Sequence, residues 1–335
     1  MPSSFLLIDS KRVEDAKFEL MRVISAIGNA TPAVPSVVSI GNFDGVHRGH
    51  RAILETVVRR ARELACRSVA MTFSPHPIRF LAPYKAPKLI STLDQKIRWI
   101  ESTGVDLLWV MNFDEGFSRL SPQEFIEQYL IERLQARSVC VGSNFNFGYR
   151  GSGNVQTLRE WEKGLEVIEV PPVVVRGGIV SSTRVRELIA EGMVSKVCRL
   201  LGRWLELEGA IVSGSARGRS VTVPTLNLDA ENELLPGQGV YVTRISLDGG
   251  AFLNSITNVG NRPTFNESTI SVETFVLNHA VPEVVRSARL QFIKRLRDEV
   301  KFESPEALRN QIAVDIARTQ RFFYRLSTLG NVGSR

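Results

Sequence analysis

The chain has 335 residues, of which 43% are hydrophobic and 23% are charged, a composition typical of a globular protein with enough apolar material for two ordinary domains. Its apolar runs fall short of the roughly 20 residues that span a bilayer, and Lys11 and Arg12 follow rather than precede a short apolar patch, so we expect a cytoplasmic protein. The net charge of +7 suits phosphate-bearing ligands, which include both nucleotides and nucleic acids.

The first half of the chain alternates apolar runs with amphipathic segments. Runs rich in Val and Leu at residues 36–40, 68–73, 106–112 and 138–142 predict buried strands. Segments at 51–64, 93–103 and 122–134 predict helices, the last of which begins with Ser121 and Glu124 spaced as a capping box. This alternation predicts a parallel sheet that binds ligands at the carboxyl ends of its strands.

The turn between the first strand and the first helix contains Gly41, Gly45, His47 and His50. Glycines at such a crossover let the backbone approach a bulky group closely. The spacing of the histidines predicts both imidazoles on one face of the first helical turn, beside free backbone N–H groups. Such a turn suits a triphosphate. An ordinary turn with incidental histidines is the alternative, although two of the chain's four histidines lie here.

Residues 141–148, Val-Gly-Ser-Asn-Phe-Asn-Phe-Gly, follow the fourth predicted strand. A glycine-rich loop with an asparagine and two aromatic side chains suits a planar ring, a ribose or a phosphate. A surface loop with its Phe side chains in the core is an equally good interpretation of the residues alone.

A second candidate anion site lies at residues 181–186, Ser-Ser-Thr-Arg-Val-Arg, where a helix is expected to begin. Hydroxyl groups at a helix start ordinarily cap it. The two arginines one turn further add guanidinium groups to free backbone N–H groups, a combination that binds anions.

From about residue 205 the pattern changes to short alternating segments separated by turn residues. We expect strands at 205–212, 239–247, 251–259, 270–277 and 288–296, which suggests a small closed antiparallel barrel. A final helix is expected from about residue 305, after Ser304, with Leu308, Ile312 and Ile316 on one face. A helical segment at 182–201, interrupted at Gly192, joins the two halves.

The string Gly-Asn-Phe-Asp-Gly-Val-His-x-Gly-His at 41–50 resembles the adenylyltransferase module of bacterial bifunctional riboflavin kinase/FAD synthetases, and the resemblance extends from about residue 36 to 325. Class I aminoacyl-tRNA synthetases share a His-x-Gly-His turn, but residues 181–186 resemble the Ser-Ser-Thr-x-x-Arg signature of nucleotidyltransferases rather than a Lys-rich one. The resemblance implies that His47, His50 and Arg186 stabilise charge on the phosphates. It also implies a nucleotide site formed by Gly41, Asn42, Phe43, Gly45, Asn144, Ser181, Ser182 and Thr183.

Pro224-Thr225-Leu226-Asn227 by itself indicates only a turn, but it resembles the riboflavin kinase signature. The resemblance implies that Thr225 and Asn227 reach Mg²⁺ and the ATP phosphates, that Gly218 binds phosphate, and that Glu273 is the base for the riboflavin hydroxyl. One departure is Thr222-Val223, where the family usually has Gly-Phe.

The implied fold is α/β: a Rossmann-like parallel-sheet nucleotidyltransferase domain at residues 1–186, then a small antiparallel β-barrel with a terminal helix at 187–330. The implied function is ATP-dependent phosphorylation of riboflavin to FMN and adenylylation of FMN to FAD. Mg²⁺, ATP and flavins are the expected ligands, without nucleic-acid or membrane partners, for a monomer or weak homo-oligomer. The alternatives are an FMN adenylyltransferase with an inactive barrel, and a nucleic-acid-binding barrel, which would need exposed aromatics interleaved with basic residues.

Overall fold

The computed structural model describes residues 21–25, 34–161, 164–212, 223–263 and 268–332. Its contacts divide the chain into two interleaved units. Unit 1 comprises Met1–Gly41, Ile53–Pro77 and Ile97–Val170, and unit 2 comprises Asn42–Ala52, Ile78–Lys96 and Pro171–Arg335. The histidine-bearing turn therefore groups with the second half of the chain. The division into functional domains at residue 186 remains a prediction.

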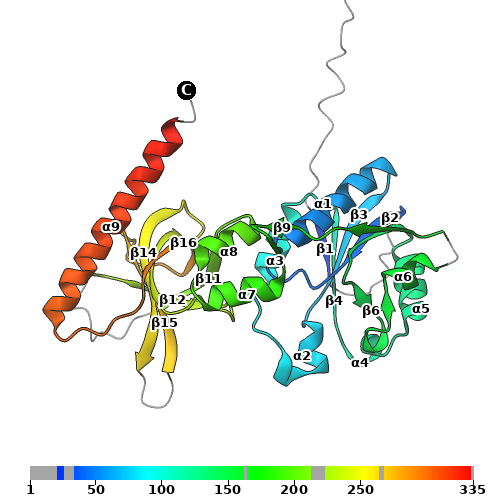
Figure 1. Ribbon diagram of the computed structural model, residues 1–335, viewed down its shortest axis with the longest axis horizontal. Helices are drawn as coiled ribbons and strands as arrows, with labels where there is room; N and C mark the ends of the chain where they lie inside the picture. The colour runs from blue at the N-terminus through cyan, green and yellow to red at the C-terminus, as the bar shows by residue number, and fades with distance from the viewer. Residues whose placement is uncertain (1–20, 26–33, 162–163, 213–222, 264–267, 333–335) are drawn as a thin grey trace, which may run out of the picture. The chain divides into compact units, whose positions relative to one another are not determined.

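Unit 1 contains a six-stranded parallel sheet with the order β1-β4-β3-β2-β5-β8 (Figure 1). The four inner strands confirm the prediction, because the Val, Ile, Leu and Met side chains that they carry are buried. The edge strands β1 and β8 were not predicted, since they are short or carry glutamates between their valines. The strands are β1 Arg22–Ile24, β2 Ser36–Ile40, β3 Arg67–Phe73, β4 Leu107–Met111, β5 Ala136–Gly142 and β8 Glu166–Val170.

The helices of the first half lie near the predicted positions. Helices α1 and α3 begin in unit 2 and end in unit 1. The larger elements are α1 Arg48–Glu63, α3 Leu93–Glu101, α5 Pro122–Phe125 and the π-helix η3 Ile126–Arg133. The shorter elements are α2 Pro77–Leu81, η2 Pro83–Lys85, α4 Glu115–Ser118, the β6 Asn146–Phe147 and β7 Gly153–Asn154 pair, η4 Tyr149–Gly151 and α6 Val155–Arg159.

The predicted capping box at the start of α5 is confirmed. Ser121 Oγ accepts a hydrogen bond from the Glu124 N–H at 3.2 Å, and the Glu124 carboxylate accepts one from the Ser121 N–H at 2.8 Å. These bonds to the charged form lower the pKa of Glu124. The box fixes where α5 begins, and η3 continues directly from it.

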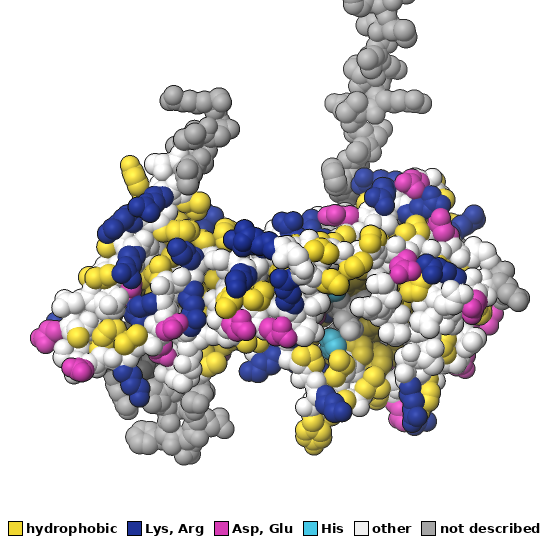
Figure 2. All heavy atoms as spheres, in the orientation of Figure 1, with side chains coloured by type: hydrophobic (Ala, Val, Ile, Leu, Met, Phe, Trp, Pro, Cys, Tyr) yellow, Lys and Arg dark blue, Asp and Glu magenta, His cyan; other side chains and the backbone are white. Residues whose placement is uncertain are grey.

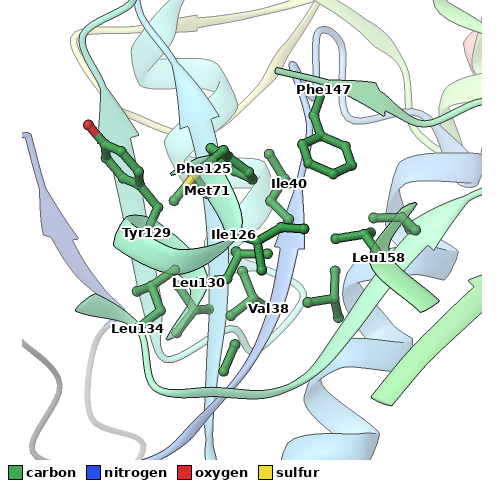
Figure 3. Packing of buried hydrophobic residues seen from close by; sticks show 14 of the residues in the cluster. Val38, Ile40, Met71, Phe125, Ile126, Tyr129, Leu130, Leu134, Phe147 and Leu158 are labelled. Atoms are coloured by element: carbon green, nitrogen blue, oxygen red, sulfur yellow. The ribbon is translucent and has the colours of Figure 1, made fainter. Parts of the chain in front are cut away.

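The core of unit 1 lies between one face of the sheet and α5 with η3 (Figure 3). Ile40 and Met71 from neighbouring strands contact Phe125, Ile126 and other side chains of this helical segment, and all four are at most 5% exposed. Burying this apolar surface stabilises the sheet that ends at the histidine-bearing turn.

Unit 2 contains a closed six-stranded antiparallel barrel with the order β11-β12-β15-β14-β13-β16 (Figure 1). Strands β11 and β13 have the predicted bounds. Strand β12 was not predicted, because Pro224 and the polar Asn227 and Asp229 make this stretch look like a turn. The strands are β11 Leu205–Val212, β12 Leu226–Ala230, β13 Gly239–Leu247, β14 Leu253–Pro263, β15 Ser268–Val276 and β16 Ser287–Arg297.

The helices of unit 2 also match the prediction. Helices α7 (Ser182–Ala190) and α8 (Val194–Leu201) are separated at Gly192, whose φ of 71° is in the left-handed region. Strands β9 (Val174–Val175) and β10 (Gly178–Ile179) pair before α7, and α9 (Pro305–Val332) follows the barrel. Across the described residues, no helix is long and apolar enough to cross a membrane.

Candidate active sites

The turn that carries the histidines has a strained backbone. Phe43, Gly45 and Val46 have φ values of 45°, 74° and 35°, and a positive φ at a β-branched residue such as Val46 is a marked outlier. A Cβ at Gly45 would lie 2.9 Å from Ile90 Cγ2, so glycine is required there by space as well as by conformation. Such a turn persists only where the surrounding structure holds it.

His47 caps the helix that follows the turn. Helix α1 begins at Arg48, three residues before the predicted start, and the His50 N–H donates to His47 Nδ1 at 3.3 Å. The two imidazole rings stack with their centroids 3.6 Å apart and their planes 15° apart. Since His47 Nδ1 accepts a hydrogen bond, its ring proton is on Nε2.

Both histidines are neutral near neutral pH. Burial is the main cause that lowers the pKa of His47 from 6.5 to about 4, and the positive charges of Arg203 and Arg186 act in the same direction, whereas Asp44 opposes them. Burial also lowers the pKa of His50 well below its usual value, reinforced by His47, Lys96 and the same two arginines. The pair can therefore donate hydrogen bonds without carrying charge.

We expect this pair to make the protein sensitive to mild acid. The unfolded chain binds a proton at His47 near pH 6.5 but the folded chain only near pH 4, so the free energy of unfolding falls as the pH decreases through this window. For His47 alone the loss between about pH 7.5 and pH 5 is about 2 kcal/mol. Denaturant unfolding at both pH values should show a smaller difference for His47→Gln than for wild type. The control variant His279→Gln changes an exposed histidine that follows β15, so its difference in free energy of unfolding between the two pH values should equal that of wild type. If His47→Gln also kept the wild-type difference, the neutral state of His47 in the folded chain would be contradicted.

Asp44 is the centre of the hydrogen-bond network behind the turn. Its side chain is 3% exposed and accepts hydrogen bonds at 3.1–3.2 Å from the backbone N–H groups of Ile90 and Ser91 and from the Ser91 hydroxyl. Ser91 Oγ in turn accepts from the Gly45 N–H at 3.1 Å. The carboxylate therefore joins the turn to the segment before α3.

Arg186 from α7 is held in place by the same carboxylate. Its Nη2 donates to Asp44 at 2.6 Å and its Nε donates to the Lys88 carbonyl at 3.0 Å. A guanidinium has five N–H donors, and within the described part of the chain Nη1 of Arg186 makes no hydrogen bond. The side chain is 17% exposed, so these donors can reach a phosphate oxygen.

The hydroxyl groups at the start of α7 have different environments. Ser181 is the N-cap and accepts a hydrogen bond from the Arg184 N–H at 3.3 Å, whereas Ser182 donates to the Asp44 carbonyl at 3.2 Å. Thr183 is exposed. Ser182 is thus the hydroxyl that ties α7 to the histidine-bearing turn.

Unit 2 brings together most of the residues predicted for the first site. Phe43 is buried and meets His50 edge-to-face at 5.4 Å, and Asn42 beside it is half-buried. Gly41 and Asn144 belong to unit 1, where the Gly41 N–H donates to the Met71 carbonyl and Asn144 is exposed in the turn after β5.

A cavity of about 360 Å³ lies in the second half of unit 2, between barrel strands and α9. Glu273 on β15 lines it, with Asn227 of β12 and Asn258 of β14 in register on its two sides. Thr225 also lines the cavity; Asn227 is 9% exposed and is not part of the lining. Gly218 lies outside the described residues.

The cavity is lined by apolar as well as polar side chains. Phe275 and Phe302 contribute rings, and the first turns of α9 contribute aliphatic side chains, so the cavity can hold a planar ring system. Glu299 lies so close to Gly260 of β14 that a Cβ at Gly260 would collide with the Glu299 carboxylate. The full lining is Val223, Thr225, Val240, Ile256, Asn258, Glu273, Phe275, Arg297, Glu299, Val300, Phe302, Leu308, Ile312, Asp315 and Ile316.

Two protein-family models match this chain. The one described as FAD synthetase matches residues 30–184, and the one described as riboflavin kinase matches residues 201–323. The bifunctional riboflavin kinase/FMN adenylyltransferase of Escherichia coli K12 is 32% identical over 307 residues, which cover 90% of this chain and 98% of the relative. The chain belongs to the bifunctional riboflavin kinase/FMN adenylyltransferase family.

A further relative and a solved structure match similar lengths of this chain. The enzyme of the same name from Bacillus subtilis 168 is 34% identical over 302 residues, 87% of this chain and 93% of that enzyme. A crystal structure described as a macrolide-efflux protein from Streptococcus pneumoniae matches with a TM-score of 0.81 and 30% identity, over 90% of this chain and 99% of the other.

This flavin-synthesising enzyme thus phosphorylates riboflavin and adenylylates FMN. The riboflavin kinase match assigns the barrel to a kinase rather than to a nucleic-acid-binding module. Figure 2 shows one face of the molecule, on which Lys and Arg side chains lie among hydrophobic and other side chains.

Sequence reasoning missed four groups in these sites. Asp44 is part of the motif at 41–50 but had no assigned role. A carboxylate repels the anion that such a site binds, so its function becomes clear only once its partner Arg186 is known. The sequence analysis gave Asn258 and Arg297 no role, and nothing local in the sequence marks Arg203.

Proposed function

We propose that FMN adenylylation takes place at the histidine-bearing turn with Arg186, and that riboflavin phosphorylation takes place in the barrel cavity. The observation that carries the first assignment is the stacked, neutral His47–His50 pair at the start of α1, next to a guanidinium oriented by Asp44. We assign the adenylyltransferase to residues 1–186, which contain the motifs at 41–50 and 181–186, and the kinase to residues 187–330, which contain the motif at 224–227.

In adenylylation, a phosphate oxygen of FMN forms a bond to the α-phosphorus of ATP, and the bond from that phosphorus to the bridging oxygen breaks to release pyrophosphate. The nucleophile is already anionic, so no general base is needed. The Nε2–H of His47, an N–H of His50 and the free donors of Arg186 would stabilise the charge that develops on the phosphate oxygens. These donors are held before the substrate arrives, which is what makes them effective.

In the kinase, Glu273 would accept the proton of the riboflavin 5′-hydroxyl as its oxygen bonds to the γ-phosphorus of ATP, while the bond from that phosphorus to the oxygen bridging it to the β-phosphorus breaks and ADP leaves. The Thr225 hydroxyl and the Asn227 amide oxygen are ligands of the kind that Mg²⁺ takes together with phosphates and water. Within the described residues no group of three His, Cys, Asp or Glu side chains could hold a metal, so a site shared with the ATP phosphates fits this donor set. Mg²⁺ bound there would neutralise charge on those phosphates.

Replacing Arg186 by lysine tests the adenylylation site. We expect Arg186→Lys to reduce the FMN-to-FAD rate by about 10²–10³-fold, because an ammonium cannot contact Asp44 and the Lys88 carbonyl and still present a fork to a phosphate. The measurement is the initial rate of FAD formation from FMN and ATP.

The matched control is Arg184→Lys, on the same helix, where the guanidinium donates to the Ile179 carbonyl at 3.3 Å. Its rate should stay near that of wild type. If Arg186→Lys also kept a near wild-type rate, the phosphate clamp would have to lie elsewhere.

A further inference from the structure

Arg203 lies between α8 and β11 and reaches the backbone of the histidine-bearing turn. Its Nη2 donates to the Gly45 carbonyl at 2.5 Å, and its Nη1 donates to the Val46 carbonyl at 3.0 Å. These two carbonyls directly precede His47. Gly45 and Val46 both have positive φ values, 74° and 35°.

A guanidinium that bridges two successive carbonyls fixes the relative orientation of two peptide planes. The planar fork of arginine does this with a fixed geometry, whereas a lysine ammonium is a point charge on a flexible stem. The strained peptide units before His47 need such support, because a backbone in a sparsely populated conformation relaxes unless it is held.

The charge of Arg203 also acts on the histidines. Burial lowers the pKa of Arg203 itself, yet a guanidinium stays charged near neutral pH. The positive charge of Arg203 lowers the pKa of both His47 and His50, and the charge of Arg186 acts in the same direction on both. Lys96 also lowers the pKa of His50, whereas Asp44 raises that of His47. Arg203 thus helps to keep the pair in the neutral form that donates hydrogen bonds.

We propose that Arg203 is a positioning residue for FMN adenylylation, which holds the Gly45–Val46 backbone so that His47 is presented correctly to the ATP phosphates. This inference rests on the proposed placement of adenylylation at the His47–His50 pair. Arg203 lies within the segment that matches riboflavin kinase (201–323) and outside the one that matches FAD synthetase (30–184). A residue counted with one module therefore serves the reaction of the other.

Positioning by Arg203 and direct binding of substrate by Arg203 predict different kinetic effects. Its Nη atoms donate to the carbonyls of Gly45, Val46 and, at 3.4 Å, Leu201. A positioning residue lowers kcat, since a small displacement of a catalytic group is costly, whereas a phosphate ligand used equally in the ground state raises the KM for ATP.

The test uses full-length Arg203→Lys and measures kcat and KM for both reactions on one preparation. We expect kcat for FMN-to-FAD conversion to fall roughly 10–100-fold, with the KM for ATP within about threefold of wild type and riboflavin phosphorylation unchanged. Arg199→Lys, an exposed arginine at the end of α8, is the control and should behave as wild type.

A second variant, Arg203→Ala, leaves space for a small cation, and added guanidinium ion should restore part of its adenylylation rate. Normal adenylylation in Arg203→Lys, a raised KM with unchanged kcat, or equal loss of both activities would overturn the proposal. His50→Ala is assayed alongside: if it retains full adenylylation, the proposed site itself is wrong, whereas loss in His50→Ala with none in Arg203→Lys rejects only the role of Arg203. Should Arg203→Ala fail to fold, the lysine variant decides.

Discussion

Glu273→Gln is expected to reduce riboflavin phosphorylation by roughly 10²–10⁴-fold, the usual worth of general-base catalysis, while conversion of supplied FMN to FAD is unchanged. The riboflavin 5′-hydroxyl is a poor nucleophile near neutral pH, so its proton must be accepted as the bond to phosphorus forms. Glutamine keeps the size and hydrogen-bonding capacity of the side chain between Asn227 and Asn258 but cannot accept that proton. The two rates are measured on one preparation, with circular dichroism to confirm folding.

The cavity offers an informative comparison for this experiment. Glu299 lines the same cavity, so Glu299→Gln distinguishes a specific base from a general need for negative charge. The exposed Glu283→Gln, between β15 and β16, serves as the neutral control. An unimpaired kinase in Glu273→Gln with a slow one in Glu299→Gln would move the base to Glu299.

His50→Ala should lower FAD synthesis by at least about 10²-fold, the effect of removing one donor to a developing oxyanion, and leave riboflavin phosphorylation intact. The variant removes both the donor and the ring on which His47 stacks. The assay follows riboflavin, FMN and FAD separately, and His279→Ala provides a control on an exposed histidine. Equal loss of both activities in a folded variant would contradict two separate sites.

The sequence predicted those features that depend on neighbouring residues. The apolar run of β2, the Ser121–Glu124 capping box and the alternation in β11 and β13 all specify local structure directly. Strand β12 was missed because Asn227 and Asp229 interrupt the apolar pattern by which a strand is recognised.

The candidate adenylylation site was predictable only in part. His47 and His50 share one turn, so their spacing identified them, and a motif identified Arg186. Asp44 and Arg203 act through contacts with residues 142 and 158 positions away, respectively. No local pattern reports such contacts, since they exist only once the chain has folded.

The interleaving of the two units has a consequence for synthesis on the ribosome. The parallel sheet of unit 1 is complete in the chain once β8 has been made at Val170, but the histidine-bearing turn, made much earlier, acquires its two guanidinium partners only when Arg186 and Arg203 emerge. At roughly 5–20 residues per second this delay lasts seconds. The nascent chain thus passes through a stage in which its sheet can form while the turn still lacks both guanidinium contacts, and these contacts are completed only as the first barrel strand, β11, begins to be made.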